Sequence, residues 1–321
     1  MPHFSDMVYQ LGGVPTLPNI PFGPNANYYF VDPANGSDGN DGLTLDSAFA
    51  TITAAEDECV ANQHDTVFYI AGSSSLSLTA TLTWDKNYTH LIGICAPTRV
   101  GQRARIFQGS AATGLSPLIN ITASGCIFKN LYVFQGVDDN TSLINVQVTG
   151  GRNYFENVHF AGGGHATMAI DGAASLKLNG AEECTFVNCT VGVDTVAAAT
   201  GTAGLLFDGA GPRNIFENCN FTMYAGHAGA KFVEVADSAG FDRYIIFRDC
   251  LFINDATGYT MTEAFTIPAG MGSATHRIIL QDCSALGATD WDTNDRGIIY
   301  ANMGTITAGG NAGLLQAAAA T

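Results

Sequence analysis

Hydrophobic and polar positions follow one short pattern that occurs six times between residues 127 and 286. Each copy reads Phe or Leu, any residue, Asn or Asp, an apolar residue, any residue, an apolar residue. A fixed period of about 30 residues is typical of solenoids, whose units bury their apolar faces only by stacking on their neighbours. The Asn/Asp positions are 27, 31, 30, 31 and 33 residues apart and are Asn130, Asn157, Asn188, Asn218, Asp249 and Asp282.

The apolar register shifts by one at each Asn or Asp, which indicates a sharp corner. In an extended strand alternate side chains share a face, so Phe216 and Asn218 would point one way and Cys219 and Phe221 the other. A strand that turns at Asn218 can bury both apolar residues. Asn and Asp tolerate the left-handed conformation that such a corner needs. We therefore expect the six corner residues to form a structural ladder, with side chains bonding along the stack.

A further β-rich run precedes each corner, so that each coil is predicted to contain three short strands. No helical periodicity long enough for a βαβ crossover lies between these runs. The pattern therefore favours an all-β parallel β-helix over a doubly wound fold. The runs cover residues 118–122, 143–148, 176–178, 204–207, 231–235 and 265–267.

The chain before the repeats predicts a cap for the solenoid. A strand over 28–31 and a turn-rich loop over 32–42 precede an amphipathic helix over 47–59, and a strand over 65–72 follows. A helix here would cover the open strand edges of the first coil. Four segments result: an extended arm 1–27, an opening segment 28–72, coils 73–296, and a C-terminal cap or subunit-contact segment 297–321.

The N-terminal arm is predicted to dock on another surface. It holds five prolines together with several large apolar residues, whereas a disordered tail would be more polar. The docking residues that we expect are Phe4, Val8, Tyr9, Ile20 and Phe22.

The opening segment resembles that of the pectin-lyase-like superfamily of right-handed β-helices. The resemblance lies in the stretches YYFVDPANGSDGNDG, AFATITAA and DTVFYIAG, and it extends through the six corners. It implies a single-stranded right-handed parallel β-helix with an N-terminal capping helix. Similar openings without a signal sequence are common in bacteriophage proteins, so the resemblance also implies a virion protein. It does not fix the function, because the superfamily contains lyases, hydrolases, tailspikes and non-catalytic structural proteins.

Charge and hydropathy exclude several partners. The net charge is -16, with 13 Lys and Arg against 29 Asp and Glu, which argues against a nucleic-acid or anionic-membrane partner. No run reaches transmembrane length, and residues 1–27 lack the features of a secretory signal. We expect synthesis in the host cytoplasm and no membrane insertion.

Four of the eight cysteines occupy one repeat position, directly after the corner. Leu131 and Val158 stand there in the first two copies, so the position is predicted to be apolar interior and the thiols to be free and buried. A parallel stack does not offer the converging ligands that a metal needs. The four are Cys189, Cys219, Cys250 and Cys283.

Candidate catalytic chemistry is sparse. Asp194 and Asp255 each follow a corner by six residues, which predicts a shared face with the carboxylates two coils, or roughly 10 Å, apart. That separation lies at the edge of the range for inverting glycosidases. The other carboxylates considered are Asp138 with Asp139, Asp171, Asp208 and Glu234. The histidines His159, His165, His227 and His276 share no repeat position, so we expect surface or turn residues.

The oxygen-rich loop Asp32–Gly42 does not match the calcium-loop pattern and is interpreted as a hydrogen-bonded turn. The sequence also lacks a phosphate-binding loop and a dinucleotide fingerprint. We therefore assign no catalytic residue, no metal site and no cofactor.

The favoured interpretation is a non-enzymatic bacteriophage virion structural protein. It would be a capsid-decoration, head-fibre or tail-associated β-helix, assembled as a homotrimer and attached to capsid or tail proteins through the arm. The alternatives are a tailspike-like polysaccharide depolymerase and a carbohydrate-binding adhesin, for which a host-surface glycan would be the partner.

Overall fold

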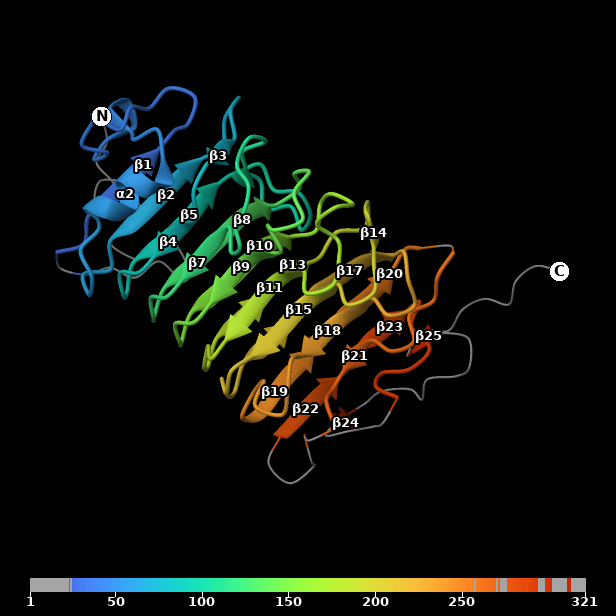
Figure 1. Cartoon of the computed structure of the whole chain (residues 1–321). Coiled ribbons are helices and arrows are strands. Elements are labelled where there is room, and N and C mark those ends of the chain that lie inside the picture. Colours follow the sequence, from blue (N-terminus) through green and yellow to red (C-terminus); the bar gives the residue numbers. More distant parts are fainter. Residues whose placement is uncertain are drawn as a thin grey trace.

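The chain forms one elongated parallel β-solenoid, whose coils follow each other in sequence order along its axis (Figure 1). The computed structural model describes residues 23, 25–256, 258–269, 271, 276–293, 298–301 and 311–312. The expected docking residues lie outside the described residues; they are Phe4, Val8, Tyr9, Ile20 and Phe22.

Two sheets build the walls of the solenoid. One has seven parallel strands, and the other has 18 and contains the strands on both sides of the corners. The seven are β4 (Leu82–Trp84), β7 (Ile119–Ile121), β9 (Ile144–Val148), β11 (Ala174–Asn179), β15 (Ala203–Asp208), β18 (Lys231–Val235) and β21 (Phe265–Thr266).

The 18-stranded sheet begins near the capped end with short strands of the first coils. These are β1 (Tyr28–Val31), β2 (Thr66–Ile70), β3 (Leu76–Leu78), β5 (His90–Ile94), β6 (Arg105–Gln108), β8 (Ile127–Phe134) and β10 (Tyr154–Ala161). The later coils contribute β12 (Thr185–Val187), β13 (Thr190–Val191), β14 (Ala197–Ala198), β16 (Ile215–Glu217), β17 (Asn220–Ala225), β19 (Arg243–Arg248) and β20 (Leu251–Asn254). The last are β22 (His276–Gln281), β23 (Ser284–Leu286), β24 (Ile298–Ala301) and β25 (Asn311–Ala312).

Each regular coil contains three strands, which confirms the sequence prediction. One coil is β15, β16 and β17, the next is β18, β19 and β20, and each strand pairs in parallel with its counterpart one coil away. The six predicted β-rich runs coincide with β7, β9, β11, β15, β18 and β21.

All six corner residues adopt the left-handed conformation. Their φ angles lie between 51° and 55°, a region that Asn and Asp tolerate better than other side chains. Within the file, Asn157 Nδ2 donates to Asn130 Oδ1 at 3.1 Å and Asn218 Nδ2 donates to Asn188 Oδ1 at 2.6 Å. The corners therefore lie one above another, and side-chain hydrogen bonds join two pairs of them.

The Phe that precedes each corner forms a stack inside the solenoid. From Phe128 to Phe247, neighbouring rings lie 4.5 to 5.0 Å apart at interplanar angles of 3° to 12°. All these rings are buried, and Leu280 continues the file in the last regular coil. Burying one such side chain contributes about 1.5 to 3 kcal/mol, so the repeat supplies a large share of the core.

The Cys that follows the corner packs into the core from the strand after the bend. The four thiols are free and buried, as predicted, and each Sγ donates to the carbonyl of a Phe one coil back, as in Cys219 to Phe186 at 3.5 Å. Burial raises the pKa of Cys219 and Cys250 well above the usual thiol value. These thiols therefore behave as small core residues.

The capping helix is shorter than predicted. The helix α2 spans Ile52–Glu58, and a short 3-10 turn, η1, spans Leu45–Ser47. Phe49 is not helical but bridges Val31 of β1, because the side chain of Thr51 accepts the N–H of Ala54 and starts the helix only there. Helix α2 buries Ile52 and Ala55 against the first coil.

The far end adds one more layer. Strand β24 pairs in parallel with β22, and β25 pairs antiparallel with β23. In the part of the chain that the structure describes, no helix has the length and apolar character needed to cross a bilayer.

The corner at Asn218 should be sensitive to side-chain branching. Asn218→Val places a β-branched residue at a φ of 53° and removes the amide bond to Asn188, so unfolding free energy should fall by about 2 to 4 kcal/mol. Asn218→Gly tolerates the backbone and loses only the amide bond, so it should lose about 1 kcal/mol. Chemical denaturation of both variants tests this, and equal losses would contradict the strained corner.

The burial of the thiols can be tested by maleimide labelling of the native and the unfolded protein. Cys95 is half-buried and the other seven cysteines are buried, so a maleimide reagent should label the native protein at Cys95 alone. After unfolding in guanidinium, all eight should react. Rapid native labelling of Cys219, located by peptide mass spectrometry, would show that this file faces solvent.

Candidate functional site

The outward face of the seven-stranded sheet carries a row of side chains along the solenoid axis, and all of them except Leu206 can form hydrogen bonds. One residue from each strand contributes, and the strand register places them side by side at a spacing of about 4.8 Å. Most are half-buried. The row is Thr83, Asn120, Gln147, Lys177, Leu206, Glu234 and Thr266.

The polar groups of this row bond to one another and to their immediate neighbours. Gln147 Nε2 donates to Asn120 Oδ1 at 3.3 Å. Lys177 Nζ lies 2.7 Å from a carboxylate oxygen of Asp208, on the next strand. The row therefore offers amide groups at one end and ion pairs in the middle.

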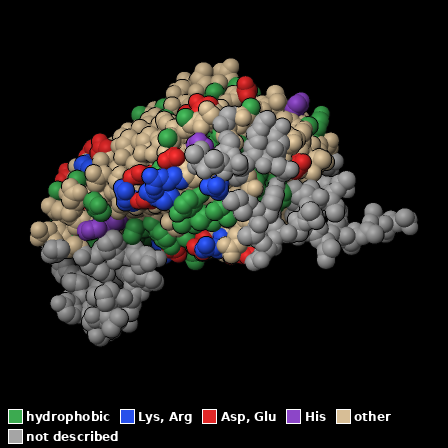
Figure 2. All heavy atoms as spheres, turned by 90° about the horizontal axis from the view of Figure 1, so that it is seen from below, with side chains coloured by type: hydrophobic (Ala, Val, Ile, Leu, Met, Phe, Trp, Pro, Cys, Tyr) green, Lys and Arg blue, Asp and Glu red, His purple; other side chains and the backbone are tan. Residues whose placement is uncertain are grey.

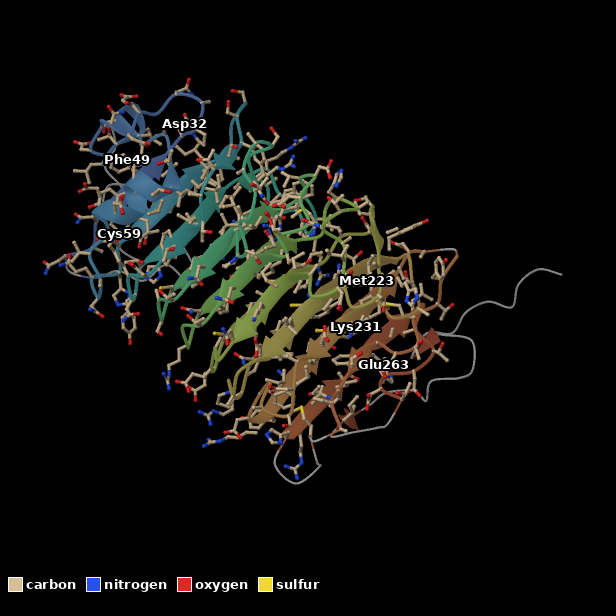
Figure 3. All side chains as sticks on the ribbon, viewed as in Figure 1. Asp32, Phe49, Cys59, Met223, Lys231 and Glu263 are labelled. Atoms are coloured by element: carbon tan, nitrogen blue, oxygen red, sulfur yellow. The ribbon has the colours of Figure 1, made fainter. Side chains whose placement is uncertain are left out.

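The acidic side chains of this face are held by cations or hydroxyl groups. Lys231 Nζ lies 3.1 Å from Glu234 Oε1. Glu263 accepts from the hydroxyl of Thr266 at 2.6 Å and from the hydroxyl of Thr293 at 2.9 Å. Lys231 and Glu263 belong to neighbouring coils of this face, at the end away from the capping helix (Figure 3).

Two carboxylates that the sequence did not pair lie near each other here. Asp208 is two residues beyond Leu206, and Leu206 is the register partner of Glu234. An offset of two residues and one strand places the two Cα atoms roughly 8 Å apart. Sequence alone missed this pairing, because it depends on the register between β15 and β18.

The prediction that Asp194 and Asp255 share a face is wrong. Tyr224 pairs with Ala197, not with Asp194, although Asp194 has the same distance from its corner. The chain leaves the strand direction at Gly192, whose φ is 105°, and Asp194 lies in the exposed connection between β13 and β14. Residues at the same sequence distance from their corners therefore do not occupy equivalent positions in this coil and the next.

His159 is also misplaced by the sequence prediction, because it is buried and not a surface or turn residue. Residues 95–104, which we call the strap, leave β5 and cross the outside of the strands that follow the corners. Gly101 N–H donates to His159 Nδ1 at 3.2 Å, and His159 Nε2 donates to Gly192 O at 2.9 Å. Burial lowers the pKa of His159, so the ring is neutral and structural.

The strap is fixed at two further points. Thr190 Oγ1 donates to Arg99 O at 2.8 Å, and Gln102 Nε2 donates to Asn157 O at 2.9 Å. These bonds connect the strap to coils that follow its own, so it covers part of the outer surface beyond the corners.

The other candidate residues have local roles. Asp139 accepts from Ser142, Thr141 and Gly114, and these bonds lower its pKa, so it anchors a turn. Asp138 and Asp171 are exposed loop residues. His165 and His227 lie in turns, and His276 begins β22.

The loop Asp32–Gly42 uses its oxygens for its own backbone. Asp32 accepts from the N–H groups of Ala34 and Asn35, and Asp38 accepts from those of Ala50 and Thr51. Across the described residues, no three His, Cys, Asp or Glu side chains are placed to hold a metal ion together.

Glu56 is a buried carboxyl group whose pKa is raised by burial. It lies in helix α2, and Lys86 Nζ is 3.1 Å from its Oε2. This pair ties the cap to the loop after β4 and so is structural.

Comparison with known proteins supports the fold. No protein-family model matches the sequence, and no curated protein sequence matches it either. Among solved structures, a pectin methylesterase in complex with a hexasaccharide aligns with a TM-score of 0.55 at 15% identity, over 86% of this chain and 87% of the other.

Two lyases align in the same way. The pectate lyase Pel9A gives a TM-score of 0.57 at 16% identity, over 88% of this chain and 69% of that one. A rhamnogalacturonan lyase gives 0.54 at 15% identity, over 80% and 68%. The protein therefore has the pectin-lyase-like fold, a right-handed parallel β-helix, as the resemblance implied. At these identities the likeness establishes the fold and leaves the activity open.

Proposed function

We propose that the protein is a structural β-helix that recognises a polysaccharide on the outward face of its seven-stranded sheet. The observation that carries the proposal is the row from Asn120 to Thr266, whose side chains follow each other at about 4.8 Å along the axis and are hydrogen-bonding at every step except Leu206. A linear glycan laid along the axis would meet one such group in each coil except that of Leu206. Hydroxyl groups of sugars bond well to amides, carboxylates and ammonium groups.

Binding without cleavage is favoured because the carboxylates are engaged. Asp208 is paired with Lys177 and Glu234 with Lys231. A carboxylate held in an ion pair with a lysine of the same chain is not free to transfer a proton to a glycosidic oxygen. The net charge of -16 favours a neutral glycan over an acidic one.

Fold similarity supports a carbohydrate ligand. One structural neighbour, a pectin methylesterase, is in complex with a hexasaccharide, and the other neighbours reported above are named as a pectate lyase and a rhamnogalacturonan lyase. This chain would share their solenoid surface as a scaffold while differing in its side chains.

The double variant Gln147→Ala/Lys177→Ala should weaken glycan binding. Each change removes a hydrogen-bonding group from the row, so retention on a bacterial surface-glycan array should fall tenfold or more, on the order of 1.5 to 3 kcal/mol. Immobilised dextran and polygalacturonate serve as the neutral and acidic reference polymers. Lys129→Ala, on the other sheet, is the matched control and should bind like the wild type. Undiminished binding by the double variant would contradict glycan binding on this face of the seven-stranded sheet.

A second candidate function, a polysaccharide depolymerase, rests on Asp208 and Glu234. Their Cα atoms are roughly 8 Å apart on the same outward face, and inverting glycosidases place two carboxyl groups on one bound sugar. It would require glycan binding to displace Lys177 or Lys231 from its carboxylate. New reducing ends during incubation with a bound glycan, abolished by Asp208→Asn, would put this candidate first.

We further propose that the protein belongs to a bacteriophage particle. The support is the resemblance of the opening segment and the apolar, proline-rich arm, which would attach the β-helix to capsid or tail proteins. On this proposal the chain is made in the host cytoplasm, assembles as a homotrimer, and presents its glycan-binding face away from the particle.

Particle membership can be measured directly. Mass spectrometry of purified virions from the source phage should detect the chain at a fixed copy number. Deletion of residues 1–22 should sharply reduce its incorporation, because Phe4, Val8, Tyr9, Ile20 and Phe22 would be lost. Full incorporation of the truncated chain would contradict the role of the arm, and absence of the wild-type chain would contradict a virion function.

A further inference from the structure

A second outward surface has a different character from the glycan-binding row. It lies on the strands that precede the corners, and one half-buried residue per coil forms a continuous uncharged stripe. Four of the six residues are Ile. The stripe is Ile127, Tyr154, Thr185, Ile215, Ile246 and Ile279.

Charged residues flank the stripe and are paired within the chain. Lys129 Nζ lies 2.9 Å from Glu156 Oε2, and Arg248 Nη1 lies 2.9 Å from Glu217 Oε1. On the other flank Arg152 contacts Glu182 at 2.9 Å. Figure 2 views the molecule from below and shows basic and acidic side chains interleaved, with apolar ones beside them.

The flanks are nearly neutral although the chain is strongly acidic. The flanks are the positions two to four residues before each stripe residue and the position two residues after it. They hold 6 of the 13 basic residues and only 5 of the 29 acidic residues. The six basic residues are Lys129, Arg152, Arg213, Arg243, Arg248 and Arg277; the five acidic residues are Glu156, Glu182, Glu183, Glu217 and Asp242. The other surfaces therefore carry the net charge, and a second acidic chain can approach here with little repulsion.

We infer that this stripe is where copies of the chain associate side by side, in parallel, around a rotation axis that runs along the solenoid. In such an assembly each stripe residue meets the same residue of the other copies. A charged side chain on the axis would meet its own charge, whereas Ile, Tyr and Thr can pack. The absence of charge along the whole stripe fits this requirement.

The flanks agree with the same arrangement. Around a parallel axis, the residue two positions before a stripe residue faces the residue two positions after it in the next copy. At Tyr154 these are Arg152 and Glu156, which have opposite charges. At Ile215 they are Arg213 and Glu217, again opposite. At each of the other four stripe residues only one of the two positions is charged, so no level sets like charges against each other. Exposed pairs contribute little affinity but favour this alignment over shifted ones.

The N-terminal arm is the rival occupant. Residue 23 lies beside the backbone of Gln63, near the start of the stripe, and 22 extended residues could span it. The arm carries one acidic residue and gives no reason for the opposite charges on the two sides of Tyr154 and Ile215. The charge pattern therefore favours a second copy.

Single cysteines on the stripe provide the test. In a Cys95→Ser background, which removes the half-buried thiol, Thr185→Cys, Ile215→Cys and Ile246→Cys are prepared one at a time. In a parallel assembly each should form a covalent dimer with a short bis-maleimide, because each position meets itself. Leu206→Cys, half-buried on the seven-stranded sheet, is the matched control and should stay uncrosslinked.

The outcomes separate the alternatives. Cross-linking at one position alone would indicate an antiparallel pair, and none at all would exclude the stripe as an interface; either result overturns the inference. Sedimentation should show an oligomer of the 33.6 kDa chain that becomes monomeric in Ile215→Asp/Ile246→Asp, with the β-type circular dichroism retained. A monomeric full-length chain that associates only after deletion of residues 1–22 would assign the stripe to the arm. The glycan-binding experiment tests the seven-stranded sheet, whereas the cross-linking experiment tests the stripe on the other sheet. Either proposal can therefore fail without affecting the other.

Discussion

The left-handed corner is the constraint on which the solenoid depends. Each coil must reverse the facing of its apolar side chains within one residue, so that Phe before the corner and Cys or an aliphatic residue after it both point inward. Asn and Asp achieve this at φ angles of 51° to 55°. Because the same bend recurs in six coils, the strands on both sides stay in register, and the Phe rings stack in parallel. The core is thus a consequence of the corner.

The exact register also makes outward surfaces into linear arrays. Any outward position of one strand is followed by its counterpart in the next coil, so chemistry is sorted into rows along the axis. The row through Lys177 is polar, and the stripe through Ile215 is uncharged. A surface of this kind suits extended or repetitive ligands, such as a polymer or another solenoid, better than a small molecule in a closed pocket.

Much of the fold could be predicted because the repeat encodes it locally. The corner residues, the β-rich runs and the interior cysteines each follow from alternation within a few residues. The errors lie where a loop, the cap or a distant segment determines the surroundings of a residue. Asp194 was misplaced because Gly192 turns the chain out of the strand, and Phe49 lies outside the helix because Thr51 starts it later. His159 was misplaced because the strap that buries it comes from a distant part of the sequence. The closeness of Asp208 to Glu234 depends on register, which spacing along one chain does not reveal.

The strap changes how the solenoid can come apart. A stack of repeats in which each unit touches only its neighbours can fray one coil at a time from either end. Here residues 95–104 leave β5 and bond to Asn157, His159 and Thr190, which belong to the two coils beyond the one that β5 adjoins. Opening the capped end must therefore break contacts several layers deep at once. The first coils are mechanically coupled, and the part of the molecule nearest the arm should resist a pulling force as a single block.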